Sequence, residues 1–151
     1  MPRLIRANYA VDMPRPVFGA HTYLDSVTDS SNADFDNMKW SNVTVDNYNA
    51  FYSTNCYYVV PVSEIYQIIN NVNLRSSAAN WTGIYIAHNT TIVAQSWQRN
   101  AANFDYNATA CRATVQCNVG DLLKCQWHND YEEPLTSGTY NQASIQLIEF
   151  S

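Results

Sequence analysis

Two alternating runs, separated by a short polar segment, constrain most strongly how this 151-residue chain folds. Apolar and polar residues alternate over residues 111–117 and again over residues 123–128. Alternation with a period of two is typical of a strand that buries one face. Residues 118–121 lie between the runs and contain Gly120, which favours a turn. The two runs therefore predict a β-hairpin with one buried face, in which Cys117 lies opposite Leu123.

Shorter β-type segments recur along the rest of the chain. The expected strands are residues 17–24, a short pair within 35–45 around Trp40, and 56–60, 64–74, 83–88, 92–97 and 143–150. Segment 64–74 also fits an amphipathic helix, but its asparagines and β-branched residues favour a strand. Asn89 and Thr90 predict a tight turn between 83–88 and 92–97. Eight to ten strands without a convincing helix predict an all-β antiparallel sandwich or barrel.

Length and charge limit the class of protein and of partner. The chain has the size of one domain, and we expect an extended arm at residues 1–14 before a folded part at 15–151. The net charge of -5 argues against nucleic-acid binding, because the phosphate backbone requires a basic surface. No apolar stretch is long enough to insert into a membrane. The N-terminus lacks the apolar core of a signal peptide, which predicts synthesis in a cytoplasm.

The four cysteines are expected to be reduced and buried. Cys111 and Cys117 share one face of a strand about 20 Å apart, too far for a disulfide. In the predicted hairpin, Cys117 and Cys125 are diagonal neighbours with poor disulfide geometry. A bond from Cys56 to one of the others stays open. Their spacing matches no zinc site.

No motif for catalysis or for cofactor binding is present in the sequence. The histidines His21, His88 and His128 lie in separate segments, and none has a second ligand at a metal-like spacing. The loop carboxylates Asp29, Asp34 and Asp36 are of a type that can bind calcium, but their spacing is not that of an EF-hand loop, which favours a solvated loop. We therefore expect neither an enzyme nor a bound metal or cofactor.

The order of several short motifs resembles the C1q-like globular head, within the tumour necrosis factor-like jelly rolls. The resemblance rests on residues 15–20, on Asn49 and Phe51 ahead of residues 60–62 and Tyr66, on residues 83–86 with 92–94, on residues 114–115 and 120–123, and on Ser144, Leu147 and Ile148. It covers residues 15–150 and implies an antiparallel jelly-roll β-sandwich that assembles as a homotrimer. The residues predicted at the trimer interface are Tyr66, Leu147, Ile148 and Phe150.

Two binding hypotheses follow from the resemblance and the composition. The first is a trimeric decoration or cement protein of a virion, made in the cytoplasm of the host of a bacteriophage, whose arm contacts a capsid protein. Its predicted contact residues are Arg3, Leu4, Ile5 and Arg6.

The alternative is an adhesion module, or the tip of a phage fibre, that binds a host receptor or a carbohydrate through aromatic loops. Its predicted contact residues are Trp81, Tyr131 and Tyr140, which the sequence places at loop ends. With 11 tyrosines, 4 tryptophans and only 14% charged residues, the composition fits a contact surface and an aromatic β-core equally well.

Overall fold

The computed structural model describes residues 15–21, 36–40, 42–76, 80–100, 104–129 and 141–149. The predicted arm with Arg3, Leu4, Ile5 and Arg6 lies outside these residues, as do Tyr131, Tyr140 and Phe150. The described residues form eleven strands in two antiparallel sheets, which confirms the all-β sandwich. Among the residues that the structure describes, no helix is long and apolar enough to cross a bilayer.

The first sheet has the strand order β3-β1-β11-β6-β9. Its strands are β1 (Val17–His21), β3 (Asn42–Asp46), β6 (Ile65–Ser76), β9 (Phe104–Gln116) and β11 (Gln142–Glu149). The prediction of a strand over 64–74 is confirmed by β6, so the helical alternative is wrong. β6 lies between β9 and β11, where its inward side chains Tyr66, Ile68 and Val72 are almost fully buried.

The second sheet has the order β4-β5-β10-β7-β8, and β2 also pairs with β10. Its strands are β2 (Asp36–Asn37), β4 (Phe51–Tyr52), β5 (Tyr57–Val59), β7 (Asn80–His88), β8 (Thr91–Asn100) and β10 (Leu122–Asn129). The tight turn predicted at Asn89 and Thr90 joins β7 to β8, and Asn89 has a positive φ of 55°. Asparagine adopts this left-handed conformation more easily than most residues.

The two predicted strands around Trp40 exist as β2 and β3, but they do not pair with each other. β2 pairs with β10 in the second sheet, and β3 pairs with β1 in the first. Trp40 lies between these two strands, where it is 7% exposed and belongs to the core.

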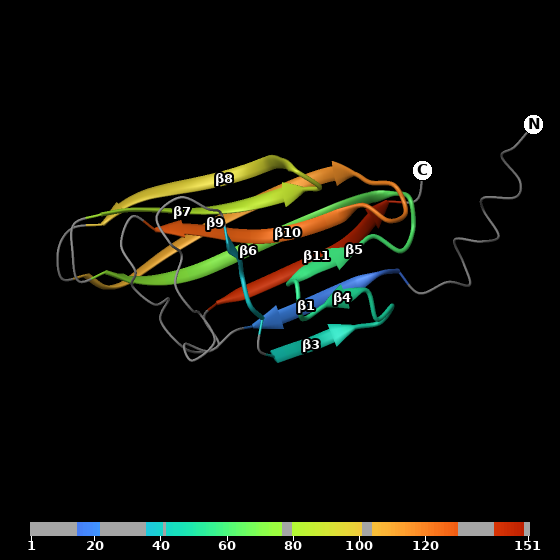
Figure 1. Cartoon of the computed structure of the whole chain (residues 1–151), viewed down its shortest axis with the longest axis horizontal. Helices are drawn as coiled ribbons and strands as arrows, with labels where there is room; N and C mark the ends of the chain where they lie inside the picture. Colours follow the sequence, from blue (N-terminus) through green and yellow to red (C-terminus); the bar gives the residue numbers. More distant parts are fainter. Residues whose placement is uncertain are drawn as a thin grey trace, which may run out of the picture.

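The long strands run along the long axis of the molecule (Figure 1). β1 begins and β11 ends at the same end of the view, on the right. The inward faces of the two sheets meet in a single hydrophobic core that includes Phe18, Tyr66, Ile84, Trp127 and Ile145. This arrangement is a jelly-roll-like sandwich in which each sheet keeps one outer face.

The predicted hairpin is wrong, because its two strands lie in different sheets. β9 pairs with β6 at the edge of the first sheet, whereas β10 pairs with β7 and β5 in the second. The connection is held by backbone bonds from Gly120 N to Val60 O and from Val60 N to Asp121 O, both 2.9 Å. Gly120 has a φ of 88°, which only glycine adopts without strain. The alternation correctly predicted one buried face per strand, but these faces meet across the sandwich.

All four cysteines are free and buried, as the sequence predicts. The predicted diagonal contact between Cys117 and Cys125 is also wrong, because Cys117 follows β9 in one sheet and Cys125 lies on β10 in the other. Burial raises the pKa of the Cys111 thiol to about 12 and that of Cys117 to about 11. The thiols of Cys56 and Cys125 also have a pKa raised by burial.

We expect none of the four thiols to react with Ellman's reagent in the native protein at pH 8. The thiolate is the reacting species, and both the raised pKa values and the burial keep it scarce and inaccessible. Absorbance of the released thiol product measures the reaction, and all four thiols should react once the protein is unfolded in guanidinium. Rapid labelling of any thiol in the native protein would contradict the burial described here.

Candidate functional site

The hairpin of β7 and β8 carries two tryptophans on its solvent-exposed face. In β7, Ile84 and Ile86 point into the core and are 0% exposed, so residues of the opposite parity face outward. Trp81 is 48% exposed, and Trp97 on β8 is 44% exposed. Trp97 pairs with Gly83, two residues from Trp81, so the two indoles are diagonal neighbours on one face.

Tyr85 and Gly83 support the indole of Trp97 from below. A Cβ atom at position 83 would lie 2.8 Å from Cζ of Tyr85 and 3.1 Å from Cδ2 of Trp97, so only glycine leaves room for the tyrosine ring. Tyr85 meets Trp97 edge-on with ring centroids 5.4 Å apart, and Trp97 lies 5.8 Å from the ring of His128 on β10. We name the surface formed by Trp81, Tyr85, Trp97 and His128 the aromatic face.

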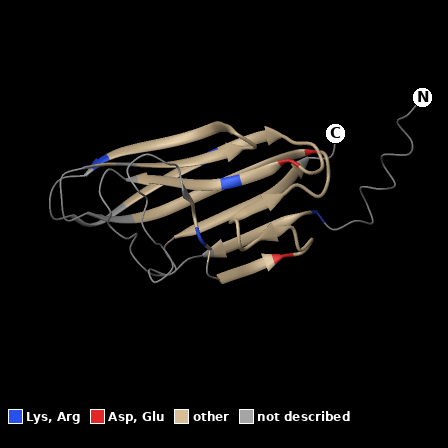
Figure 2. Ribbon diagram, in the orientation of Figure 1, with Lys and Arg blue, Asp and Glu red and all other residues tan. Residues whose placement is uncertain are grey.

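Hydrogen-bonding side chains border the aromatic face. Nε1 of Trp97 donates to Oε1 of Gln95 at 3.4 Å, which orients the indole. Arg99 lies opposite Trp81 in the register, and Gln126 lies on the same side of β10. Figure 2 shows that Lys, Arg, Asp and Glu are sparse along the strands. The surface is therefore aromatic and rich in hydrogen-bonding groups, but it carries little charge.

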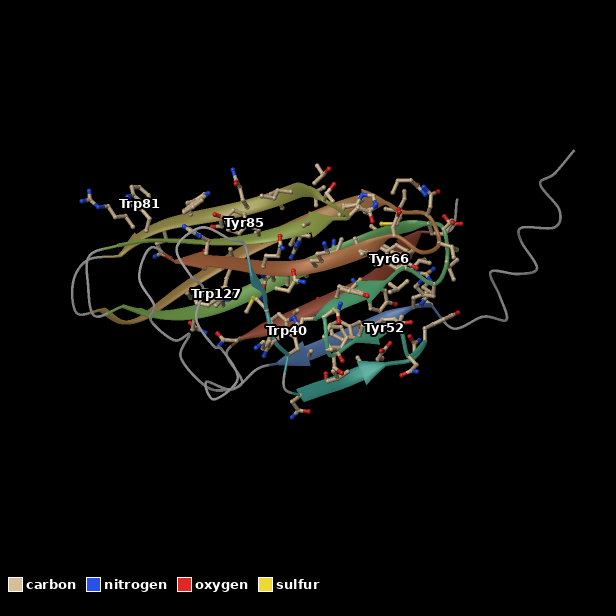
Figure 3. The ribbon with its side chains drawn as sticks, in the orientation of Figure 1. Trp40, Tyr52, Tyr66, Trp81, Tyr85 and Trp127 are labelled. Atoms are coloured by element: carbon tan, nitrogen blue, oxygen red, sulfur yellow. The ribbon has the colours of Figure 1, made fainter. Side chains whose placement is uncertain are left out.

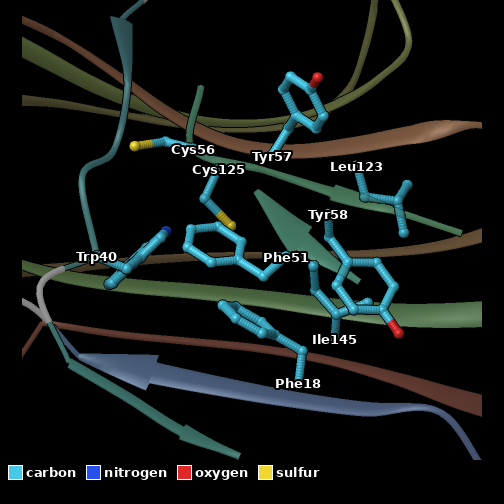
Figure 4. Close-up of a pocket in the computed structure, with 9 residues that line it drawn as sticks. All are labelled: Phe18, Trp40, Phe51, Cys56, Tyr57, Tyr58, Leu123, Cys125 and Ile145. Atoms are coloured by element: carbon cyan, nitrogen blue, oxygen red, sulfur yellow. The ribbon is translucent and has the colours of Figure 1, made fainter. Parts of the chain in front are cut away.

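A small cavity between the sheets is one interior alternative to this surface site within the described residues (Figure 4). It has a volume of about 10 Å³ and is lined by Phe18, Trp40, Phe51, Cys56, Tyr57, Tyr58, Leu123, Cys125 and Ile145. Such a space holds about one water molecule, whereas small-molecule sites enclose roughly 300–1,000 Å³. The cavity cannot hold a small-molecule ligand, so the aromatic face is the better candidate site.

The structure separates the predicted site residues into different environments. Trp81 is the second residue of β7 and lies at the margin of the molecule, whereas Trp40 and Trp127 lie within the outline of the sheets (Figure 3). Tyr66 and Leu147, predicted at a trimer interface, are 0% and 3% exposed inside the sandwich of one chain. Their burial therefore needs no second subunit. The hydroxyl of Tyr66 donates to the carbonyl of Val62 at 3.0 Å.

Ile148 differs from Leu147, because it is the unpaired residue at an irregularity in β11 and is only partly buried. The outward residues that precede it on β11 are Gln142, Ser144 and Gln146, and none of them is charged. Ile148 is therefore the one described member of the predicted interface set that a partner subunit could reach.

Sequence reasoning missed three members of the aromatic face: Tyr85, Trp97 and His128. They come from three strands, and the pairing of those strands was not known from the sequence. The sequence contains one signal for Trp97. Residues 95, 97 and 99 alternate along β8 with the residues that face inward. Trp97 lies between the polar residues Gln95 and Arg99 in this alternation, which indicates that its side chain is on the surface.

Apart from the aromatic face, a cluster of polar side chains stabilises the connection between β9 and β10. Asp121 accepts hydrogen bonds from Nδ2 of Asn89 at 3.0 Å and from the backbone N of Asn118 at 2.8 Å. Its Oδ2 also lies 2.8 Å from Nε2 of His88. These contacts, that of Asn89 first, lower the pKa of Asp121 from 3.8 to about 2. The carboxylate thus ties the β7–β8 turn to the β9–β10 connection.

We expect stability to depend on the ionisation of Asp121 at acid pH. Because its folded pKa is lowered to about 2, its stabilising contribution is complete above about pH 4 and is lost as the pH falls to 2. The measurement is the urea midpoint of the wild type and of Asp121→Asn at pH 5, 4, 3 and 2, in buffer containing EDTA. The gap between the two proteins should narrow steadily over this range. A gap that stays constant down to pH 2 would contradict the assignment.

No family model matches the sequence, and no curated protein matches it. Among solved structures, 243 chains match. One is the globular domain of the zebrafish complement 1qA protein, with a TM-score of 0.60 and 12% sequence identity. The match covers 91% of this chain and 100% of that chain. At this identity the likeness establishes the fold and leaves the function to be argued from the surface. The chain has the all-β sandwich fold of a C1q globular domain.

Proposed function

We propose that this chain is a non-enzymatic binding module that holds a neutral carbohydrate on its aromatic face. The observation that carries the proposal is the pair of exposed indoles, Trp81 and Trp97, side by side on one hairpin. Exposed aromatic clusters on a folded domain mark interaction surfaces, because contact of apolar rings with water is unfavourable unless a partner covers them.

The chemistry of the face favours a sugar over other ligands. The C–H faces of a pyranose ring stack on indole rings, and its hydroxyl groups exchange hydrogen bonds with amide and guanidinium groups. Gln95 and Arg99 supply such groups beside the two tryptophans. Because charge is sparse on this sheet, a neutral glycan fits better than a sulfated or phosphorylated one.

The face is rigid before any ligand arrives, which lowers the entropic cost of binding. Both tryptophans belong to paired strands rather than to loops. Tyr85 is 0% exposed and packs edge-on against Trp97, and the hydrogen bond to Gln95 further restrains that indole. A preformed aromatic surface on a strand hairpin suits one side of an extended polysaccharide.

Affinity electrophoresis tests the proposal directly. The purified protein is run through native gels that contain soluble neutral polysaccharides, such as a glucan, a galactomannan, a xylan and a mannan. We expect at least one of them to retard the wild type, and Trp81→Ala or Trp97→Ala to remove the retardation. Mobility that is unchanged in every gel, together with no signal on a glycan array, would contradict the proposal.

The trimer implied by the resemblance stays a prediction, and it would strengthen weak glycan contacts through multivalency. Light scattering on a size-exclusion column should give three times the chain mass of 17.1 kDa. We expect Ile148→Lys to convert the trimer into a monomer, because a buried unpaired charge costs several kcal/mol. Val119→Lys is the matched control, since that side chain is 64% exposed in a connection. A monomeric wild type would refute the trimer.

The capsid-decoration hypothesis also stays a prediction, because its arm residues lie outside the described part of the chain. Deletion of residues 1–14 should abolish attachment to capsids under this hypothesis and leave glycan binding unchanged. Unchanged capsid affinity after the deletion would show that residues 1–14 do not mediate attachment, which contradicts this hypothesis.

A further inference from the structure

We propose that His88, Cys117 and Asp121 form a binding site for a divalent transition metal ion of the zinc class. The three residues come from the end of β7, from the position after β9 and from the connection before β10. Their nitrogen, sulfur and carboxylate ligand atoms all lie within 4.8 Å of one another. This site is separate from the aromatic face and does not depend on the proposed function.

The spacing of the ligand atoms suits one small ion. Bond lengths to zinc of about 2.0–2.3 Å place neighbouring ligand atoms of a tetrahedral site roughly 3.3–3.6 Å apart. Nε2 of His88 and Oδ2 of Asp121 are 2.8 Å apart, in a contact that a proton occupies in the metal-free protein. An ion replacing that proton would push this pair slightly apart and draw Sγ of Cys117 inward.

The donor set selects the kind of ion. One imidazole, one thiolate and one carboxylate suit zinc and its neighbours, whereas calcium and magnesium prefer oxygen ligands alone. Cys117 is 0% exposed, and its pKa is raised to about 11 by burial and then by the charge of Asp121. A cation bound to Cys117 and Asp121 offsets both the burial of the thiolate and its repulsion by the carboxylate. Metal binding would therefore release the thiol proton.

The surroundings leave an entry path and orient the ligands. The side chains of His88 and Asp121 are 21% and 18% exposed, so an ion can reach them from solvent and a water can complete its coordination. Asp121 is already held by Asn89 and by the backbone of Asn118, as ligands in metal sites are held by outer hydrogen bonds. The cluster lies on the turns at the end of the sandwich where β1 begins and β11 ends (Figure 1).

Titration of the reduced, EDTA-treated and desalted full chain with Co²⁺ tests the site. We expect one Co²⁺ per chain and a near-ultraviolet band from thiolate-to-cobalt charge transfer, which added Zn²⁺ abolishes by displacement. Cys117→Ser should remove the band, and His88→Gln should weaken Co²⁺ binding at least about tenfold. Cys56→Ser is the matched control, because it removes a buried thiol outside the cluster and should leave the band intact.

Two results would overturn the proposal. One is the absence of saturable Co²⁺ binding to the folded wild type. The other is a charge-transfer band that survives in Cys117→Ser or disappears in Cys56→Ser. Circular dichroism checks that each variant is folded, and if Cys117→Ser unfolds, the partly exposed His88→Gln decides the question. Retardation by polysaccharide should be the same with and without the ion, which separates this test from that of the glycan site.

Discussion

Replacing Trp81 and Trp97 together by alanine is expected to abolish polysaccharide binding while the sandwich stays folded. Truncating a central aromatic contact typically costs about 2 kcal/mol, near thirtyfold in affinity, and the double variant loses both rings of the stacking surface. Each side chain is close to half exposed, so its removal leaves no large void in the core. Isothermal titration with an oligosaccharide of the retarding polysaccharide measures the loss.

Two further variants separate the aromatic face from the rest of the surface. Tyr52→Ala removes a 54% exposed aromatic on β4, at the opposite edge of the same sheet, and should leave the affinity unchanged. Gly83→Ala should reduce affinity without removing any contact group, because its methyl group displaces the ring of Tyr85. Equal losses in Tyr52→Ala and the double variant would indicate non-specific adhesion.

Trp127→Ala is expected to have the largest effect on stability. This indole is 3% exposed in the core, on the β10 strand that pairs with β7, β5 and β2. Large-to-small substitutions of this kind cost about 3–5 kcal/mol, a large part of the roughly 5–15 kcal/mol that stabilises a typical domain. Thermal denaturation followed by circular dichroism should show a midpoint lowered by about 10 °C or more.

Trp81→Ala is the control for this prediction, since the same substitution at the surface should change the midpoint little. The two tryptophan variants are thus expected to have opposite effects on thermal stability and on affinity. Trp127→Ala loses stability and retains affinity in its folded fraction, whereas Trp81→Ala retains stability and loses affinity. A similar midpoint for both variants would contradict the assignment of core and surface.

The strands themselves could be predicted from the sequence, because alternation reports directly which side chains are buried. The strand β6 was recognised from its asparagines and β-branched residues, and the β7–β8 turn from Asn89. The partner of a strand is a different matter. Cys117 and Leu123 would show the same alternation in a hairpin as in two sheets that face each other, so β9 and β10 were paired wrongly.

The candidate sites were predictable only in part, for a related reason. Trp81 stood out because it follows a polar segment, but Tyr85 and His128 gain their role from neighbours on other strands. The fit of Tyr85 also depends on an absent side chain at Gly83, which no pattern of residue types reveals. His88 and Asp121 are 33 residues apart and meet only through the fold, so ligand spacing in the sequence could not find them.

The central claim is that the aromatic face is the ligand-binding surface, and the indole N–H signals of the four tryptophans test it most directly. In a ¹H–¹⁵N correlation spectrum recorded during titration with the bound oligosaccharide, the signals of Trp81 and Trp97 should shift. Those of the buried Trp40 and Trp127 should stay in place. Saturable binding that leaves both Trp81 and Trp97 unshifted would place the ligand elsewhere and contradict the account.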